Sequence, residues 1–364
     1  MSVVKLKYEI LVSGIYPFEG EYEKLGFKLV SKHFDEDIIN YLRDAGAIYF
    51  SPYILMCSYV NSTGTPVYLV FEKEETVEID YSNTNEYDVK TTNDFIEKKW
   101  STDNIESLEQ ILTLTINNDI KFPVKMVTVY KPDGTFLTIK ANFIKTNASP
   151  LLSNDRNVTL EKMKRQENRL SSGFAYEKIL ELRDHNKYFQ NALSLFYSSY
   201  SVNEEVVSFT LLISALEAIF SKSTYESVEV CTTCSQKMYK IRQSVSENVS
   251  KILLDSDGEI CKKIKKLYDK RSAFLHEGNR NISIDDYYAL QEYVRNVLLM
   301  YWYVSLNISS YEHKVIMAEI HSDNMRQKFM YNNFLIGLDN SSFKEKQAKM
   351  IFESIKAIME GKAP

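Results

Sequence analysis

The stretch Val206-Val-Ser-Phe-Thr-Leu-Leu-Ile-Ser-Ala-Leu-Glu-Ala-Ile-Phe220 decides the fold class of the second half of the chain. Its apolar residues run almost all round a helix of 3.6 residues per turn instead of forming one stripe. Such a helix is stable only where neighbouring elements cover every side of it. We therefore expect a buried central helix over 203–221, with other helices packed round it.

Helical periodicity continues on both sides of this stretch, from about residue 158 to the end. Asp285 and Asp286 are expected to cap the start of the last long helix. The residues after 310 are expected to form a helical extension, 311–364, packed on a bundle of residues 158–310. The further helices that we expect within the bundle are 174–200, 241–254, 258–275 and 284–307.

The first 150 residues show the two-residue alternation of strands instead. Strands are expected at 5–12, 67–71 and 76–81, the last two separated by the charged Glu72-Lys-Glu-Glu75. A hairpin is expected over 124–140, because Lys131-Pro-Asp-Gly134 supplies a turn between two alternating runs.

Helices and a domain boundary complete the expected architecture. Short helices are expected at about 35–45, capped by Asp35, and at 103–112, capped by Ser101 or Thr102. The small polar residues and the proline of 146–156 indicate a boundary. The sequence therefore predicts an α+β chain of two domains: a strand-rich domain over 1–150, followed by an all-α helical bundle.

Charge is distributed unevenly along the chain, whose net charge is −5. Residues 1–150 hold 15 basic and 22 acidic residues, so this half is a poor nucleic-acid surface. Residues 231–280 hold 11 basic and 6 acidic residues. This local excess indicates either a solvated helix face or a surface for an anion such as RNA phosphate.

Other patterns limit the class of protein. No run of about 18 apolar residues is present, so no membrane span is expected. The N-terminus lacks the apolar core of a secretory signal, and four cysteines do not make a disulfide scaffold. We expect a cytoplasmic protein. Phosphate-binding glycine loops, serine-hydrolase elbows and zinc-protease motifs find no match.

The segment Tyr268-Asp-Lys-Arg271-Ser-Ala-Phe-Leu-His276 carries the chemistry that the sequence suggests. Residues five apart on a straight helix point about 140° apart, so Arg271 and His276 would not share a face. They could converge within one chain only if the helix ended or distorted between them. Glu277-Gly278-Asn279 is an expected helix stop, with Gly278 as a left-handed C-cap.

An Arg–His pair suits cleavage of RNA through attack of a 2′-hydroxyl on the adjacent phosphate. Histidine titrates near neutral pH and serves as base or acid, whereas arginine stays charged and binds phosphate with two parallel hydrogen bonds. One histidine cannot fill both proton-transfer roles in one step, but two His276 side chains in a dimer could divide them. From spacing alone, a surface arginine and a histidine at a helix end is the commoner explanation.

The order of motifs resembles the Apea-like branch of the HEPN superfamily over residues 180–310. Ala215-Leu-Glu-Ala-Ile-Phe220 ends the central helix, and Tyr239-Lys-Ile-Arg-Gln-Ser-Val245 opens another after an insertion. Ile264-Lys-Lys-Leu-Tyr268 then leads into the Arg271–His276 segment, which a last long helix follows. The sequence departs from many active members at Ser272, where those have Asn, Asp or His.

This resemblance implies a dimeric helical bundle acting as a metal-independent endoribonuclease of an antiviral, abortive-infection or toxin system. Arg271 would bind the phosphate and His276 would transfer protons on an RNA substrate such as tRNA or mRNA. The strand-rich domain would sense a phage or host trigger or restrain activity. The alternative is a non-catalytic HEPN module that dimerises or binds a nucleotide or protein.

The residues expected to bind RNA or to support Arg271 and His276 are Ser272, Tyr268, Lys270 and Glu217. Glu217 lies within an apolar helix, where a charge is costly unless it is paired. It could form an internal salt bridge that fixes the bundle, or it could position Arg271.

Cys231-x-x-Cys234 has the spacing of a zinc knuckle. A structural site needs four ligands, which could come from Cys57 and Cys261, from water or from the same pair in a second subunit. Redox-active thiols and inert packing are the other interpretations. No cofactor is expected for catalysis.

Overall fold

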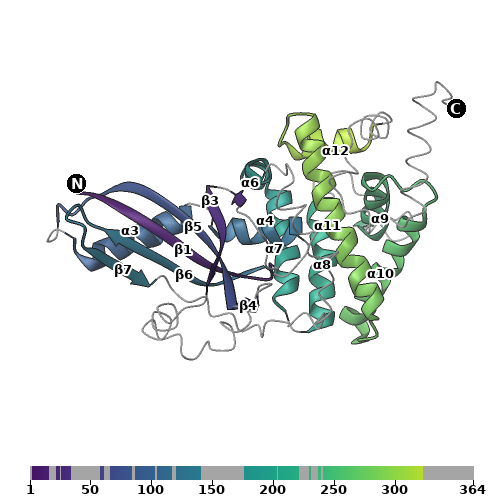
Figure 1. Ribbon diagram of the computed structural model, residues 1–364. Coiled ribbons are helices and arrows are strands. Elements are labelled where there is room, and N and C mark those ends of the chain that lie inside the picture. The colour runs from purple at the N-terminus through teal and green to yellow at the C-terminus, as the bar shows by residue number, and fades with distance from the viewer. Residues whose placement is uncertain are drawn as a thin grey trace, which may run out of the picture. The chain divides into compact units, whose positions relative to one another are not determined.

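The computed structural model describes residues 2–15, 22–24, 26–33, 58–60, 66–83, 87–102, 105–116, 120–140, 176–202, 204–220, 229–230, 237–238 and 241–322. The chain divides into two compact units, Met1–Tyr176 and Glu177–Pro364. The first contains an antiparallel sheet and the second is largely helical, so the protein is mixed α+β (Figure 1).

The sheet is built round β1 (Ser2–Ser13), which pairs antiparallel with β5 (Pro66–Ile79) and β6 (Lys121–Tyr130). Its strand order is β2-β3-β5-β1-β6-β7, and β4 (Ser58–Val60) also pairs with β5. The outer strands are β2 (Tyr22–Lys24), β3 (Phe27–His33) and β7 (Phe136–Lys140).

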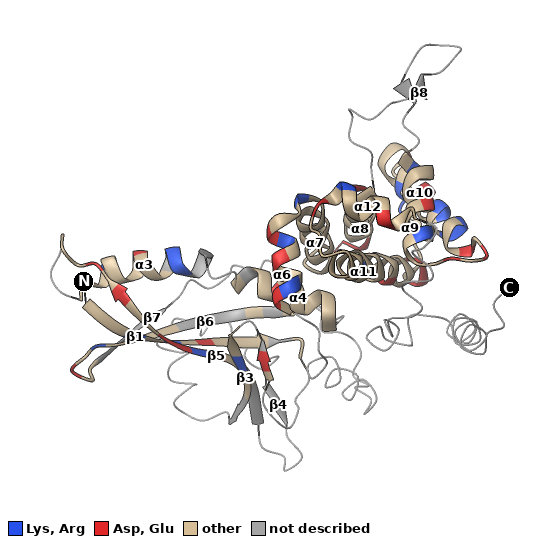
Figure 2. Cartoon of the chain, turned by 90° about the horizontal axis from the view of Figure 1, so that it is seen from above, with Lys and Arg blue, Asp and Glu red and all other residues tan. Residues whose placement is uncertain are grey.

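One face of this sheet forms the core of the first unit. Alternate residues of β1 are buried, as the alternation of strand side chains requires: Val4, Leu6, Tyr8, Ile10 and Val12. Figure 2 shows α3 (Val89–Thr102) and α4 (Ile105–Ile116) along one side of the sheet. The β1 strand that the sequence predicted is confirmed.

The expectation of two separate strands at 67–71 and 76–81 is wrong, because β5 runs unbroken through the charged residues between them. Alternation accounts for this result: successive residues of a strand point to opposite faces. Glu74 is exposed, whereas Glu75 accepts a hydrogen bond from the Tyr8 hydroxyl at 2.6 Å and pairs with Lys99 of α3 at 3.3 Å. A charged run therefore need not end a strand.

The predicted hairpin and one predicted short helix are confirmed, but the residues expected to cap that helix do not cap it. The Gly134 amide donates to the Lys131 carbonyl at 3.0 Å with φ 82°, so the turn between β6 and β7 is the expected one. Helix α4 confirms the expected helix near 103–112. Ser101 and Thr102 do not cap it, because they form the end of α3. Helix α3 itself was not predicted from the sequence.

The helical unit begins with two helices where one was expected. Helix α6 (Tyr176–His185) ends before Asn186, and α7 (Lys187–Tyr200) begins after it. Asn186 is the N-cap of α7: its side-chain oxygen accepts from the Phe189 amide at 2.9 Å. The expected single helix over 174–200 is therefore wrong at this break.

Helix α8 (Glu205–Phe220) is the predicted buried helix, since every residue after Glu205 is buried or half-buried. It contacts α7, α9 (Ile241–Ile252), α10 (Glu259–Glu277) and α11 (Ile284–Asn307). A short α12 (His313–Ile320) follows, and β8 (Glu229–Val230) pairs with β9 (Lys237–Met238). The helices expected at 241–254, 258–275 and 284–307 are confirmed.

Several expectations fall outside the described residues: the helix at 35–45, the boundary at 146–156 and the extension beyond 322. Among the residues that are described, no helix is long and apolar enough to span a bilayer.

Candidate functional site

Helix α10 carries both residues of the Arg–His pair and ends as the sequence predicts. It is continuous from Glu259 to Glu277, and Gly278 follows in the left-handed conformation with φ 68°. The Gly278 amide donates to the Phe274 carbonyl at 3.0 Å, which satisfies one of the carbonyls that a helix end leaves unpaired. His276 therefore lies in the last turn, one turn beyond Arg271.

Glu217 of α8 receives donors from two residues of α10. The Tyr268 hydroxyl donates to one carboxylate oxygen, and an Nη of Arg271 lies 3.5 Å from the other. The Arg271 guanidinium carbon lies 5.7 Å from the centre of the Tyr268 ring, within range of a cation–π contact. Burial and the Glu217 carboxylate raise the pKa of Tyr268, so its hydroxyl stays a proton donor at neutral pH.

Arg271 is thus held on the side of α10 that faces α8, with about a fifth of its side chain exposed. A guanidinium has five N–H donors, and only one of them is directed at Glu217. The Arg271 Nε is buried and has no hydrogen-bond partner in the described parts of the chain. Among the described residues, the hydrogen-bond donors of this side chain other than the one directed at Glu217 therefore have no partner.

His276 is exposed and lies on another side of the helix. Because α10 shows no break between residues 271 and 276, the two side chains leave the axis about 140° apart. Within the described residues, no group hydrogen-bonds to the imidazole of His276. One copy of the chain therefore does not bring Arg271 and His276 onto one face.

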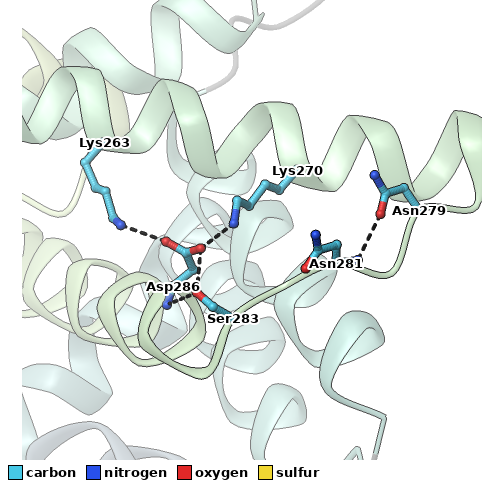
Figure 3. Close-up of polar contacts among 6 residues, drawn as sticks. All are labelled: Lys263, Lys270, Asn279, Asn281, Ser283 and Asp286. Carbon is cyan, nitrogen blue, oxygen red and sulfur yellow. Dashed lines mark hydrogen bonds and ion pairs between the residues drawn. The ribbon is translucent and has the colours of Figure 1, made fainter.

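Lys270, expected to support RNA binding, is engaged with another helix. Its ammonium lies 2.5 Å from a carboxylate oxygen of Asp286 in α11, and that of Lys263 lies 2.7 Å from the other oxygen (Figure 3). Ser272 is half-buried, with no described hydrogen-bond partner for its side chain.

Asp286 of α11 joins this helix to α10, a role that the sequence did not predict. Ser283, not Asp285 or Asp286, is the N-cap of α11, and its hydroxyl donates to Asp286 at 2.7 Å (Figure 3). Burial opposes ionisation, but hydrogen bonds from Lys263, Lys270 and Ser283 outweigh it and lower the pKa of Asp286. The spacing Ser283-x-x-Asp286 was the signal available, since a capping box pairs residues at this distance.

The proposed zinc ligands cannot be placed. Cys231, Cys234 and Cys57 lie outside the residues whose side chains are described, and Cys261 is half-buried with a free thiol. In the described part of the chain, no three His, Cys, Asp or Glu side chains gather as a metal site would require. The zinc expectation therefore stays a prediction.

Comparison with known proteins adds no relative from which a function could be transferred. No family model matches the chain, and no curated protein or solved structure shows a significant match.

Proposed function

We propose that the protein is a metal-independent endoribonuclease of the HEPN type, acting in the cytoplasm in antiviral defence or as a toxin. The observation that carries the proposal is the arrangement on α10. Arg271 pairs with Glu217 and lies over the Tyr268 ring, and His276 is exposed in the last turn. A fixed cation and an exposed imidazole are the two groups that phosphodiester cleavage needs.

The reaction would be attack of a ribose 2′-oxygen on the neighbouring phosphorus. The new O–P bond forms as the bond to the 5′-oxygen breaks, which leaves a 2′,3′-cyclic phosphate and a free 5′-hydroxyl. Arg271 would stabilise the negative charge of the phosphorane, and His276 would accept the 2′-hydroxyl proton or donate one to the 5′-oxygen. No metal takes part in these steps.

Two copies of the chain are required by this mechanism. Base and acid must act in the same step, and each chain offers one exposed His276 on this helix end. A homodimer through the helical unit would place two such imidazoles, and a partner's Arg271, round one phosphate. The strand-containing unit would then sense a phage or host trigger or restrain cleavage.

Incubation of purified protein with labelled tRNA and mRNA tests the proposal. Wild type should yield fragments ending in a cyclic phosphate, and His276→Ala and Arg271→Ala should each reduce the rate by at least about a hundredfold. His321→Ala is the matched control, because His321 is also exposed but lies at the end of α12. Cleavage unchanged in His276→Ala would refute the proposal.

The alternative is a non-catalytic module that dimerises or binds a nucleotide or protein. It is favoured by the engagement of Arg271 with Glu217, which gives this arginine a role within the fold. If this alternative holds, wild type will not cleave RNA even with cell extract from infected bacteria added as a source of the trigger. Arg271→Ala would then lower the midpoint of unfolding, and neither this variant nor wild type would cleave RNA.

A further inference from the structure

Two lysines of α10, Lys265 and Lys266, carry charges that no acid neutralises in the described parts of the chain. Lys266 is exposed and Lys265 is half-buried. The other cations on this helix each form an ion pair: Lys262 with Glu259 at 2.8 Å, Lys263 and Lys270 with Asp286, and Arg271 with Glu217. Among the described residues, Lys265 and Lys266 are therefore the cations of α10 without an ion-pair partner.

Lys265 lies on the His276 side of the helix, and Lys266 lies about 80° round the axis from His276. Ser272 and His276 follow Lys265 by seven and eleven residues, so all three leave the axis within about 40° of one another. Lys266 flanks this stripe, whereas Arg271 points toward α8. Along the axis, Lys265 and His276 are about 16 Å apart.

Charges of both signs surround the stripe. Asp269 also lies on this side, but Arg242 of α9 pairs with it at 2.6 Å. The other acids near these cations are Glu259, which pairs with Lys262, the exposed Glu277, and Asp255 and Asp257, which also act on Lys262. Figure 2 shows Lys and Arg along α10 and α9. An anionic chain that reached His276 would therefore be attracted chiefly at Lys265 and Lys266, with which no acid of the described residues forms an ion pair.

We propose that single-stranded RNA lies along the exposed stripe of α10, from His276 toward Lys265 and Lys266, and that each lysine contacts a phosphate. This inference rests on the proposed function, because the cleaved phosphate fixes the position of the strand at His276. A distance of about 16 Å corresponds to about five stacked nucleotides at ~3.4 Å each. The contacts are to the backbone, so they add affinity without base preference.

The test measures binding separately from cleavage. The full-length protein is titrated with a fluorescent RNA oligonucleotide that carries a 2′-O-methyl group on every ribose, which removes the attacking hydroxyl. Fluorescence anisotropy at several NaCl concentrations gives the slope of log K against log salt. Losing two phosphate contacts should make this slope about 1.4 less steep for Lys265→Ala/Lys266→Ala than for wild type.

The control is Lys187→Ala/Lys314→Ala, which changes the net charge equally. Both lysines are exposed, and they lie in the first turns of α7 and α12. Their loss should leave the slope as in wild type. The inference is overturned if the Lys265→Ala/Lys266→Ala slope is unchanged, or if the control lowers the slope equally.

A parallel cleavage assay on the unmodified oligonucleotide separates this inference from the proposed function. Cleavage by wild type together with an unchanged slope would overturn the RNA path alone. A reduced slope together with no cleavage, also when the extract that supplies the trigger is added, would support RNA binding along α10 and refute the nuclease. Binding of protein or mononucleotide, with no RNA binding by wild type, would overturn both.

Discussion

At the scale of single residues, Glu217 shows how one carboxylate serves both a helix contact and a candidate site. A charge inside an apolar helix is costly unless donors reach it, and here Tyr268 and Arg271 of α10 supply them. From the sequence, Glu217 was expected either to form an internal salt bridge that fixes the bundle or to position Arg271. The same contacts with α10 would serve both roles. The sequence shows that Glu217 needs a partner, but its partners lie 51 and 54 residues away, beyond the reach of local patterns.

Replacing Tyr268 with Phe should lower the free energy of unfolding by about 2 kcal/mol, because the half-buried Glu217 loses a hydrogen bond to a charged group. Urea denaturation monitored by circular dichroism measures this change. Tyr288→Phe is the control, since Tyr288 is 59% exposed and its loss should cost under about 0.5 kcal/mol. Equal losses of unfolding free energy in the two variants would show that the hydrogen bond from Tyr268 to Glu217 does not stabilise the fold.

Asp286 should make stability depend on pH in the acid range. Its pKa is lowered in the folded protein, so its ion pairs stabilise the fold above the pKa of an unfolded aspartate, about 3.9. This stabilisation is lost as the pH falls toward the lower folded-state pKa.

Asp286→Asn should therefore lower the unfolding free energy by about 2 kcal/mol at pH 7, and the difference from wild type should shrink below about pH 4. Urea titrations of both proteins at several pH values measure the difference. Asp285→Asn is the neighbouring control, because Asp285 is exposed. A difference from wild type that stays constant down to pH 3 would contradict the assigned ion pairs.

At the scale of elements, the C-terminal end of α10 was predicted, whereas the break between α6 and α7 and the N-caps of α4 and α11 were not. Gly278 stops α10 where the sequence indicated, because a left-handed residue after a helix is a strong local signal. The break at Asn186 was missed because apolar periodicity continues across it. Its cause is tertiary: the Asn186 amide donates to the Tyr301 hydroxyl at 3.0 Å and to the Tyr311 carbonyl at 2.8 Å.

Gly278→Ala should destabilise the protein by about 1 kcal/mol, because alanine is strained at φ 68°. Gly278→Asn should recover part of this loss, since asparagine tolerates the left-handed region better than alanine does. The added side chain meets no atom within 4 Å, so backbone strain alone is being measured. Thermal unfolding of the three proteins gives the order, and equal stability of the Ala and Asn variants would contradict it.

Asn186→Ala should cost about 2–3 kcal/mol, because it removes the N-cap of α7 and leaves the buried Tyr301 hydroxyl without this donor. Asn191→Ala is the control, since Asn191 is exposed in the same helix. Chemical denaturation compares the two. A loss no larger for Asn186→Ala than for Asn191→Ala would show that the break does not depend on this side chain.

At the scale of the whole molecule, composition and periodicity predicted the α+β class and the change from strands to helices. They could not show where Arg271 points, because that depends on the packing of α10 against α8. They also could not show that Lys270 is taken up by Asp286, which lies 16 residues further along the chain. The candidate site was thus predicted as a set of residues, and its geometry came from tertiary contacts.

The proposed need for two copies makes the activity depend on protein concentration. Cleavage per chain should fall when the protein is diluted below its dimer dissociation constant, because one chain places only one His276 at the site. Rates measured over a dilution series, beside sedimentation velocity at the same concentrations, test this expectation. A constant rate per chain in a monomeric sample would contradict a shared site.

The pairing of β1 has a consequence for synthesis of the chain. The central strand β1 is synthesised before both of its partners, β5 and β6, which end at residues 79 and 130. At about 5–20 residues per second, β1 waits several seconds for its first partner and longer for its second. During that time a strand with six core side chains has no partner strand to pair with. The N-terminal segment is therefore where a nascent chain would most need a chaperone.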